Sequence, residues 1–465
     1  MSIHEECGVF GIYSTEKIDI ANMCYYGLYA LQHRGQESCG IVTNKDGIFH
    51  TYKDLGQVNE VFTNDILNQF EECNMGVGHV RYGTTGANTM NNVQPIEVYH
   101  RKGKMAIAHN GNISNALQLR DELEMNGAIF HSTSDTETIA YMITKSRLHT
   151  PSIEEAVLDV IKDLEGAFSL VIMSAQKLIA VRDPHGFRPL CYGKIDNGYV
   201  IASESCALHA VGATFVRDLE PGEMLIFSKE GIKVDKRYCN TKKKHTCIFE
   251  YIYFARSDSM IDSISVHDAR INAGKILAKY DTVDVDYVIG VPDSGLEAAL
   301  GYSQAKGIPY EIGLIKNKYI GRTFISPNNR SDKVRIKLNP VESVIKDKKI
   351  ILIDDSIVRG TTSKHIVSLL REAGAKEIHM RISSPPFLHP CYYGTDIDSE
   401  EHLIANKHTV EAIAKIIGVD SLLFLPKEEL VNLVHTDTIC SSCFDGDYPT
   451  TVYKDTRKDR FENSL

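Results

Sequence analysis

The sequence predicts two domains of different fold class: a layered α+β domain followed by an α/β domain built on a parallel sheet. The chain has 465 residues, more than the ~100–200 residues that one domain usually takes. Before about residue 236, short apolar runs mix with helical patterns in no regular order. After that point, strand and helix patterns alternate. This change in the order of strand and helix patterns favours two domains with separate hydrophobic cores.

The first half contains short runs that are apolar throughout, together with amphipathic patterns whose apolar residues lie three and four apart. Fully apolar runs indicate strands buried on both faces, so we expect stacked sheets with helices outside, an α+β or αββα arrangement. The strand patterns are 8–13, 39–42, 75–80, 105–110, 168–173, 178–181, 199–203 and 224–227, and the helical patterns are 115–125, 136–146 and 153–164.

The second half alternates strand patterns at 285–293, 348–355 and 377–384 with helical patterns at 294–307 and 361–375. This order is typical of βαβ units and a parallel sheet, in which ligands bind at the carboxyl ends of the strands. We expect a leader of residues 1–6, domains at 7–236 and 237–450, and a tail at 451–465.

Composition excludes several classes. A net charge of −10 argues against a nucleic-acid binder, and the basic run 242–244 is interpreted as a solvated connector. No apolar run approaches the ~18–20 residues of a membrane helix, and the acidic N-terminus does not resemble a secretory signal. Eleven scattered cysteines indicate reduced thiols, used for metal binding or catalysis rather than disulfides. We expect a cytoplasmic protein without nucleic-acid or membrane partners.

A candidate phosphate site follows the strand pattern at 348–355. Asp354 and Asp355 end this strand, and Gly360, Thr361 and Thr362 follow at a helix start. Hydroxyls and free N–H groups at a helix N-terminus favour a phosphate, and glycine lets the backbone approach it. Adjacent acids there need a sugar diol or Mg²⁺ as partner. The alternative is an ordinary turn whose acids face water.

This segment resembles the phosphoribosyl pyrophosphate (PRPP) motif of type I phosphoribosyltransferases. The resemblance implies that the acidic pair contacts the ribose hydroxyls and that the loop from Arg359 to Thr362 grips the 5′-phosphate. Residues 290–295 are similar to the family's pyrophosphate loop, which implies that Ser294 contacts Mg²⁺ together with the two aspartates. The alternative for Asp293 and Ser294 is a plain helix cap.

Residues 316–325 are similar to the flexible catalytic loop of the amidophosphoribosyltransferases. Lys316 and Arg322 supply positive charge that suits a pyrophosphate leaving group, and closure of such a loop excludes water. The segment 326–333 is shorter than the usual family loop and lacks its glutamine-rich portion, so the detail of closure does not carry over.

Four blocks of the first half, at 5–11, 32–38, 78–86 and 109–112, resemble the N-terminal-nucleophile (Ntn) hydrolase glutamine amidotransferases. The resemblance implies an αββα glutaminase domain. It also implies a role for each of five residues: Cys7 as nucleophile, Asn110 and the Gly111 N–H as oxyanion hole, Arg81 on the glutamine carboxylate and Asp135 on its α-ammonium. A further block, 182–190, also matches the family; it is interpreted as structural or interfacial and has no catalytic role.

Activation of Cys7 suggests processing. Only a thiolate attacks, and a free cysteine has a pKa of ~8.5. Removal of residues 1–6 gives Cys7 its own α-amine, whose pKa of ~7.7–8.0 suits a general base near neutrality. The sequence therefore predicts that residues 1–6 are a propeptide.

Cys440 and Cys443 form a CxxC pair, which indicates a metal or redox motif. Together with the segments around Cys247 and Cys391, this pair resembles the ligand segments of the iron–sulfur branch of the amidophosphoribosyltransferases. Four thiolates fit a [4Fe–4S] cluster; a Cys₄ zinc site is the alternative. Since the reaction has no redox step, we expect a structural cluster.

Taken together, the motifs resemble the amidophosphoribosyltransferase family over about residues 5–450. This implies glutamine and PRPP as substrates, Mg²⁺ and a [4Fe–4S] cluster as cofactors, a sheltered ammonia channel, feedback inhibition by purine nucleotides and a homotetramer. One alternative is another Ntn-type amidotransferase, such as a hexosamine or asparagine synthetase, against which the Asp354–Asp355 motif argues. The other is a non-catalytic PRPP-sensing regulator, which the acidic chain and Cys7 disfavour.

Overall fold

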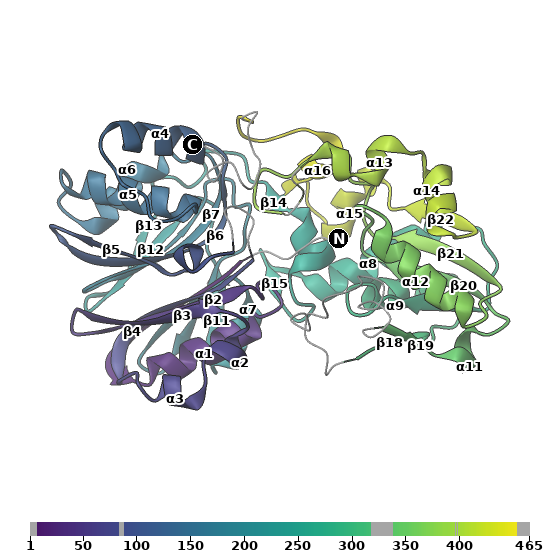
Figure 1. Ribbon diagram of the computed structural model, residues 1–465, viewed down its shortest axis with the longest axis horizontal. Helices are drawn as coiled ribbons and strands as arrows, with labels where there is room; N and C mark the ends of the chain where they lie inside the picture. Colours follow the sequence, from purple (N-terminus) through teal and green to yellow (C-terminus); the bar gives the residue numbers. More distant parts are fainter. Residues whose placement is uncertain (1–6, 83–87, 318–337, 396, 398, 453–465) are drawn as a thin grey trace.

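The computed structural model describes residues 7–82, 88–317, 338–395, 397 and 399–452. The proposed propeptide 1–6, Arg322 and the tail after residue 452 lie outside the described residues. Two units lie side by side, an earlier one in purple and blue and a later one in green and yellow (Figure 1). Within the described ranges, no helix has the length and apolar character needed to cross a membrane.

The first unit contains two antiparallel sheets. The seven-stranded sheet has the order β11-β9-β10-β1-β4-β2-β3 and the six-stranded sheet β13-β12-β8-β7-β6-β5. The strands of the first are β1 (Gly8–Ile18), β2 (Ser38–Lys45), β3 (Ile48–Leu55), β4 (Cys73–Arg81), β9 (Cys191–Ile195), β10 (Gly198–Ala202) and β11 (Thr214–Asp218). Those of the second are β5 (Ile96–His100), β6 (Gly103–Ile113), β7 (Gly166–Ser174), β8 (Leu178–Arg182), β12 (Met224–Ser228) and β13 (Gly231–Asp235).

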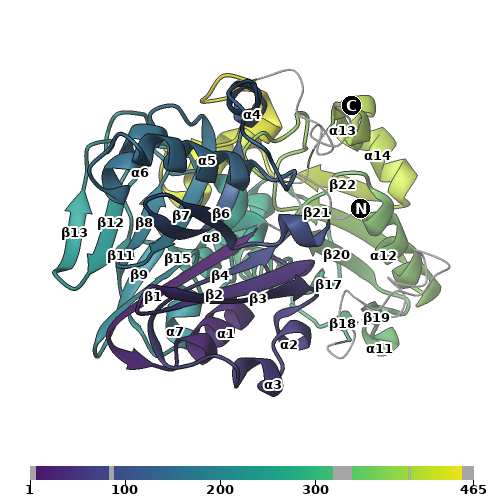
Figure 2. The same ribbon diagram turned by 60° about the vertical axis from the view of Figure 1, so that its left-hand side comes forward.

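The two sheets pack face to face between two helical layers (Figure 2). Their shared core includes Val9 and Val77 from one sheet and Ala108 and Val171 from the other. Helices α1 (Ile20–Ala30) and α7 (Ser205–Ala210) cover the outer face of the first sheet. Helices α5 (Asp135–Arg147) and α6 (Ile153–Ile161) cover that of the second. The predicted αββα arrangement is confirmed.

The sequence patterns missed α1 and five strands at or near the sheet edges. Strands β3 and β13 are largely exposed or half-buried along their length, so they lack the continuous apolar run that marked the buried strands. Helix α1 carries tyrosines at its exposed positions, which obscures its amphipathic period. The unit also contains α2 (Val58–Val61), α3 (Asn64–Leu67), η1 (Met90–Asn92) and α4 (Ala116–Met125).

The second unit is built on a four-stranded parallel sheet, β17 (Tyr287–Gly290), β20 (Lys349–Asp354), β21 (Glu377–Ile382) and β22 (Ser421–Phe424). Along β20, Ile351 and Ile353 pack against α8 (Val266–Lys279) and α9 (Leu296–Lys306). The alternate residues Ile350 and Leu352 pack against α12 (Thr361–Glu372) and α14 (Val410–Ile417) on the opposite face. Both faces are buried, as expected for a parallel sheet, and the predicted α/β class is confirmed.

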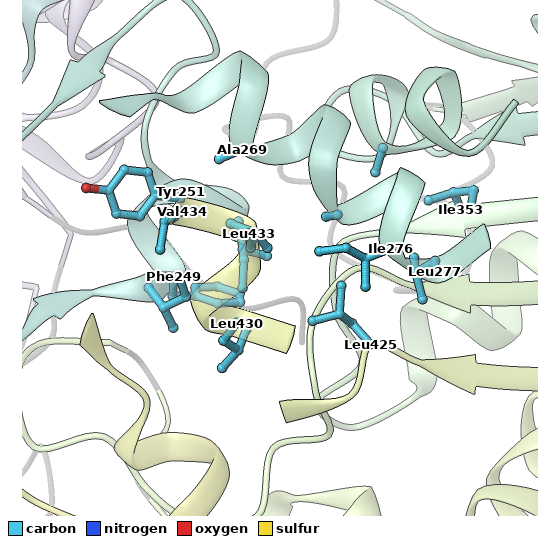
Figure 3. Packing of buried hydrophobic residues seen from close by; sticks show 14 of the residues in the cluster. Phe249, Tyr251, Ala269, Ile276, Leu277, Ile353, Leu425, Leu430, Leu433 and Val434 are labelled. Atoms are coloured by element: carbon cyan, nitrogen blue, oxygen red, sulfur yellow. The ribbon is translucent and has the colours of Figure 1, made fainter. Parts of the chain in front are cut away.

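The C-terminal segment returns to the start of this unit. Leu430 and Leu433 of α15 (Leu430–Val434) pack against Phe249 (Figure 3). Nearby, β14 (Thr246–Cys247) pairs in parallel with β23 (Ile439–Cys440), and this register aligns Cys247 with Cys440. The remaining elements are η2 (Glu250–Phe254), β15 (Met260–Ile261), β16 (Ile264–Ser265), β18 (Leu314–Lys316), β19 (Leu338–Pro340), α11 (Glu342–Ile345), η3 (Glu400–His402), α13 (Ile404–Lys407), η4 (Lys427–Glu429) and α16 (Ser442–Asp445).

Candidate functional site

Cys7 lies directly before β1, at the end of the first sheet where β4 finishes. The antiparallel register pairs Gly8 with Val80, so Cys7 lies beside Arg81 and Tyr82. Its thiol Sγ donates to the Tyr82 carbonyl oxygen at 3.4 Å. Cys7 is buried, as is Arg81. The structure therefore brings the predicted nucleophile and the predicted carboxylate-binding arginine together.

Asn110 and Gly111 lie on β6 in the facing sheet. Side chains alternate along a strand, and Ala108 points into the core between the sheets, so Asn110 points there too. Its side chain is fully buried, and neither its amide nitrogen nor its oxygen has a hydrogen-bond partner among the described residues. A buried amide without a hydrogen-bond partner lowers the stability of the folded protein. Such a group is typical of a binding site in which the ligand supplies the missing hydrogen bonds.

Gly111 has a positive φ of 140°, and an added Cβ would lie 2.1 Å from the Ala167 carbonyl oxygen. No other residue fits this position without moving the neighbouring strand β7. The two sheets are tied together next to this point, because His79 Nε2 donates to the His109 carbonyl at 3.0 Å. Burial lowers the pKa of His79 to about 3, so this imidazole is neutral near pH 7.

Asp135 begins α5, after Ser134 whose hydroxyl caps the helix by accepting from the Thr136 N–H. The Asp135 carboxylate accepts from the Ile113 N–H at 3.0 Å and lies 3.6 Å from His109 Nδ1. It is 5% exposed. Through its hydrogen bond with Ile113, the predicted ammonium-binding carboxylate of Asp135 lies next to β6, two residues beyond Gly111.

A buried charge network joins Cys7 to the second unit. Arg34 Nε donates to the Cys7 carbonyl oxygen at 3.0 Å, and its Nη atoms donate to Glu204 at 2.6 Å and Glu250 at 2.8 Å. Arg188 lies 3.4 Å from the same Glu250 carboxylate, and all four side chains are fully buried. Two positive and two negative charges therefore compensate one another inside the protein.

One member of this network, Glu204, is held in its ionised form. Burial acts to raise the pKa of Glu204, but the electrostatic interactions and hydrogen bonds with His33 and Arg34 outweigh it and hold that pKa well below its usual range. A second ion pair, Arg182 with Asp262 at 2.6 Å, also crosses between the units. The interpretation of residues 182–190 as structural or interfacial is thereby confirmed.

Sequence reasoning missed this network. Arg34 belongs to one of the recognised blocks, but its partner Glu250 is 216 residues away in the chain. No local pattern indicates such a pair.

The second candidate site lies at the carboxyl end of β20. Asp354 and Asp355 are each 7% exposed, which contradicts the alternative of a turn with solvated acids. Ser294 Oγ donates to Asp355 Oδ1 at 2.6 Å, and Ser356 donates to the other oxygen. Burial raises the pKa of both carboxyls, and the charge of Asp355 raises that of Asp354 further. Adjacent buried carboxylates and a hydroxyl form a set of oxygen atoms suited to Mg²⁺.

The loop after β17 approaches this pair closely. An added Cβ on Gly290 would lie 2.7 Å from the Gly295 carbonyl oxygen, so the turn requires glycine. The alternative of a plain cap for Asp293 and Ser294 is not supported, because α9 has Gly295 as its N-cap without a side-chain cap bond. Asp293 instead pairs with Lys316, at the end of β18. Lys316 is thus near the candidate pyrophosphate loop, whereas Arg322 lies outside the described residues.

The N-terminus of α12 forms the third side of this site. Gly360 caps the helix with φ of 75°, and an added Cβ would lie 2.9 Å from Ile404 Cδ1. Thr361 is exposed and Thr362 half-buried at the first two helical positions, and the preceding Arg359 is half-buried. The helix start therefore presents hydroxyls and N–H groups where a phosphate can bind.

The four predicted cluster cysteines line a single small cavity. Its other walls include Phe187, Phe249, Phe387 and Tyr393, and the Tyr393 N–H donates to Cys391 Sγ at 3.4 Å. Burial raises the pKa of Cys440 to about 11, so metal binding there must displace protons. Four thiols around one apolar cavity are the ligand set of either a [4Fe–4S] cluster or a Cys₄ zinc site.

The zinc alternative would use the same four thiols. Zinc needs its sulfur ligands to converge at ~2.3 Å from one point. Across the described parts of the chain, no three histidine, cysteine, aspartate or glutamate side chains are grouped so as to hold one metal ion.

Comparison with known proteins matches both units. Residues 79–210 match the glutamine amidotransferase domain family, and residues 262–383 match the phosphoribosyl transferase domain family. The amidophosphoribosyltransferase of Methanocaldococcus jannaschii is 49% identical over 96% of this chain and 98% of its own length. That of Bacillus subtilis is 47% identical over 98% of this chain and 96% of its own length.

Two solved structures share the whole architecture. The glutamine PRPP amidotransferase from B. subtilis, complexed with ADP and GMP, has a TM-score of 0.90 and 46% identity, and the match covers 97% of this chain and 98% of that one. A structure described as the allosteric regulatory enzyme of purine biosynthesis has a TM-score of 0.92 and 46% identity, with 99% of both chains covered.

Proposed function

The chain belongs to the amidophosphoribosyltransferase family, and from this premise we propose which residues carry the two halves of its reaction. The protein is a glutamine-dependent pentosyltransferase of purine biosynthesis. It converts PRPP, glutamine and water into 5-phosphoribosylamine, glutamate and pyrophosphate. The observation that carries the residue assignment is the Ser294–Asp355 contact, which joins the two loops of a phosphoribosyl site in the chain that also carries Cys7.

In the glutaminase half, the Cys7 thiolate attacks the glutamine amide carbon, and Arg81 and Asp135 hold the carboxylate and the α-ammonium of the substrate. The planar guanidinium matches a carboxylate with two parallel hydrogen bonds. The Asn110 amide and the Gly111 N–H donate to the oxyanion. Removal of residues 1–6 frees the α-amine of Cys7 as the general base. The unpartnered amide of Asn110 supports this assignment.

In the phosphoribosyl half, Asp354 and Asp355 accept hydrogen bonds from the ribose hydroxyls and, with Ser294, hold Mg²⁺. Bound Mg²⁺ supplies positive charge to the pyrophosphate leaving group. The segment of residues 359–362 holds the 5′-phosphate at the N-terminus of α12. Lys316 and Arg322 add positive charge on the pyrophosphate side. Ammonia reaches the ribose C1 through a channel sheltered from water.

Cys247, Cys391, Cys440 and Cys443 hold a [4Fe–4S] cluster with a structural role. The cavity that these four side chains share supports a common metal site for them, and the resemblance of their segments to the iron–sulfur branch favours the cluster. The cluster ties the C-terminal segment to the start of the second domain, next to the pairing of β14 with β23. The divisions 1–6, 7–236, 237–450 and 451–465 stand as the proposed propeptide, glutaminase domain, phosphoribosyltransferase domain and tail.

Three further properties are part of the proposal. Purine nucleotides inhibit the enzyme; the B. subtilis relative, whose structure contains ADP and GMP, supports this. The enzyme is cytoplasmic, consistent with its reduced cysteines. It assembles as a homotetramer, a state that sedimentation of the purified protein tests.

Glutamate release by anaerobically purified protein tests the assignment. With glutamine, Mg²⁺ and PRPP, we expect glutamate and pyrophosphate to form one for one, and much less glutamate to form without PRPP. Mass spectrometry of the same sample should show Cys7 as the first residue. Glutamate release that ignores PRPP and yields no pyrophosphate would contradict the proposal for the second site. Full activity in protein that keeps Met1 would contradict the propeptide.

A further inference from the structure

The segment of residues 391–394, which carries one of the four cavity cysteines, packs against the strand that carries Asn110 and Gly111. Asn112 Nδ2, on the same strand β6, donates to the Tyr392 carbonyl oxygen at 2.8 Å, a contact between residues 280 apart in the chain. In Figure 1, β6 and β7 lie on the side of the first unit that faces β14. The second domain therefore touches the glutaminase site directly.

The contact at residue 394 is a close backbone approach. Gly394 has φ of 116°, and an added Cβ would lie 3.4 Å from the Gly111 carbonyl carbon and 3.5 Å from its Cα. A side chain at residue 394 would therefore touch the Gly111 backbone, and also Arg188 Nη2, which lies 3.3 Å from the same position. A shift of residues 391–394 would therefore also displace the Gly111 peptide.

Arg188 and Phe187 hold the same segment from the first domain. Arg188 donates to the Tyr393 carbonyl oxygen from Nε at 3.1 Å and from Nη2 at 2.7 Å. The Phe187 ring stacks on Tyr393 with centroids 4.1 Å apart and planes 18° apart. Arg188 also pairs with Glu250, which pairs with Arg34 on the Cys7 carbonyl. The segment is therefore linked to both the nucleophile and the oxyanion strand.

We propose that residues 391–394 of the second domain are a positioning element of the glutaminase site, which holds the oxyanion strand through Asn112 and Gly111. This inference rests on the proposed roles of Asn110 and Gly111. Oxyanion donors act only when they are fixed at about 2.7–3.1 Å from the developing charge, and small misplacements are costly. The glutaminase site is thus completed by a segment that the phosphoribosyltransferase domain supplies.

Asn112→Ala removes the donor to Tyr392 and leaves Cys7, Asn110 and both arginines in place. Asn406→Ala is the matched control, because Asn406 Nδ2 also donates to a backbone carbonyl, Leu388 O, at 2.8 Å, but does not touch β6. We expect Asn112→Ala to lower kcat for glutamine hydrolysis about tenfold with KM nearly unchanged, as for an interaction made only in the transition state. Ammonia-dependent phosphoribosylamine synthesis and the visible absorbance of the cluster should not change, which shows an intact fold.

A second measurement reads the oxyanion site without turnover. Glutamate γ-semialdehyde adds to Cys7: a bond forms between Sγ and the aldehyde carbon, the carbonyl π bond breaks, and the thiol proton ends on the former carbonyl oxygen. That oxygen occupies the oxyanion position. We expect Asn112→Ala to weaken aldehyde binding by the same factor as kcat, and the isosteric Asn112→Asp to weaken it further, since it places a carboxylate against the Tyr392 carbonyl.

The outcomes separate this inference from the function on which it rests. If Asn112→Ala matches Asn406→Ala in both kcat and aldehyde affinity, the positioning role is wrong. It is also wrong if the ammonia-dependent rate falls in parallel, because that indicates general unfolding. If Asn110→Ala itself leaves aldehyde affinity unchanged, the proposed oxyanion hole fails first.

Discussion

The buried charges beside Cys7 and those at the end of β20 are arranged in opposite ways. Around Arg34, two arginines and two glutamates compensate one another at distances of 2.6–3.4 Å. At Asp354 and Asp355, two buried carboxyls of the same sign lie next to each other, and burial raises the pKa of both. The first group is complete within the protein, whereas the second gains from a cation.

This contrast matches the two kinds of chemistry. The glutaminase site acts on a small amide with a nucleophile and hydrogen-bond donors, so its charges serve to fix geometry. The phosphoribosyl site must bind a polyanion, so its acids are useful only together with Mg²⁺. Metal affinity is therefore linked to protonation in the second site.

The largest expected effect tests whether the two sites are separable. Cys7→Ala removes the nucleophile and should lower glutamine-dependent synthesis by about 10⁴-fold or more. With ammonia as the nitrogen source, synthesis should stay near the wild-type rate, because the site at β20 does not use Cys7. Steady-state pyrophosphate release with each nitrogen donor measures this. An equal loss with ammonia would show that the two sites are not independent.

Asp355→Asn tests the other site. It removes one negative charge from the proposed Mg²⁺ and ribose contacts and should lower synthesis with either nitrogen donor by about 10²–10³-fold, the usual effect of losing one electrostatic contact to the reacting groups. The rate of aldehyde addition to Cys7 serves as the control and should be unchanged. A defect confined to glutamine-dependent synthesis would assign Asp355 to the wrong site.

The third prediction concerns stability rather than rate. Glu250→Gln leaves Arg34 and Arg188 with one negative charge fewer, and breaking a buried pair costs about 3–5 kcal/mol. Urea unfolding should show this loss in the free energy of unfolding. Asp46→Asn is the matched control, since the Lys17–Asp46 pair is exposed at 44% and 67% and, as a solvent-screened surface pair, should contribute little to the free energy of unfolding. If Glu250→Gln and Asp46→Asn lowered the free energy of unfolding equally, the buried charges around Arg34 would not stabilise one another as described.

The smallest expected effect concerns the raised pKa of Asp354, in contrast to the lowered pKa of Glu204. Because burial raises the folded-state pKa of Asp354, the folded protein binds this proton more tightly than the unfolded chain, and stability falls as pH rises from the unfolded pKa of ~3.9 toward the raised value. Asp354→Asn removes this penalty. Without Mg²⁺, we expect it to raise the Tm by about 2–4 °C at pH 7.5, for a gain of about 1 kcal/mol in a domain of this size.

The same Tm measurement at pH 4.5 provides the control for Asp354→Asn. There more of the wild-type carboxyl is protonated in the folded protein than at pH 7.5, because its pKa is raised, so the gain should shrink. Glu204 should behave in the opposite sense: its folded pKa lies below its ordinary value, so its contribution is present above the unfolded pKa and is lost as pH falls through the folded one. A gain for Asp354→Asn that is larger at pH 4.5 would contradict the assignment.

Local patterns predicted the parts of the fold that are buried on both faces. Strands β1, β6, β7 and β20 are continuous apolar runs, and helices α5 and α12 follow recognisable caps or periods. Edge strands such as β3 and β13 were not predicted, because their exposed positions interrupt the apolar run that marks a buried strand. For the sites, the motifs led to the residues, and the structure brought Cys7 to Arg81 and Ser294 to Asp355.

The sequence by itself determined the fold class of both domains and the residues of each motif, because burial pattern and motif spacing are local properties of the chain. Only the tertiary structure decided what lies across the domain boundary. It joined Arg34 to Glu250, Asn112 to Tyr392, and the four cysteines to one cavity. In each of the two hydrogen-bonded pairs, the partners lie more than 200 residues apart in the chain. Their pairing follows from how two cores pack against each other, which no short segment encodes.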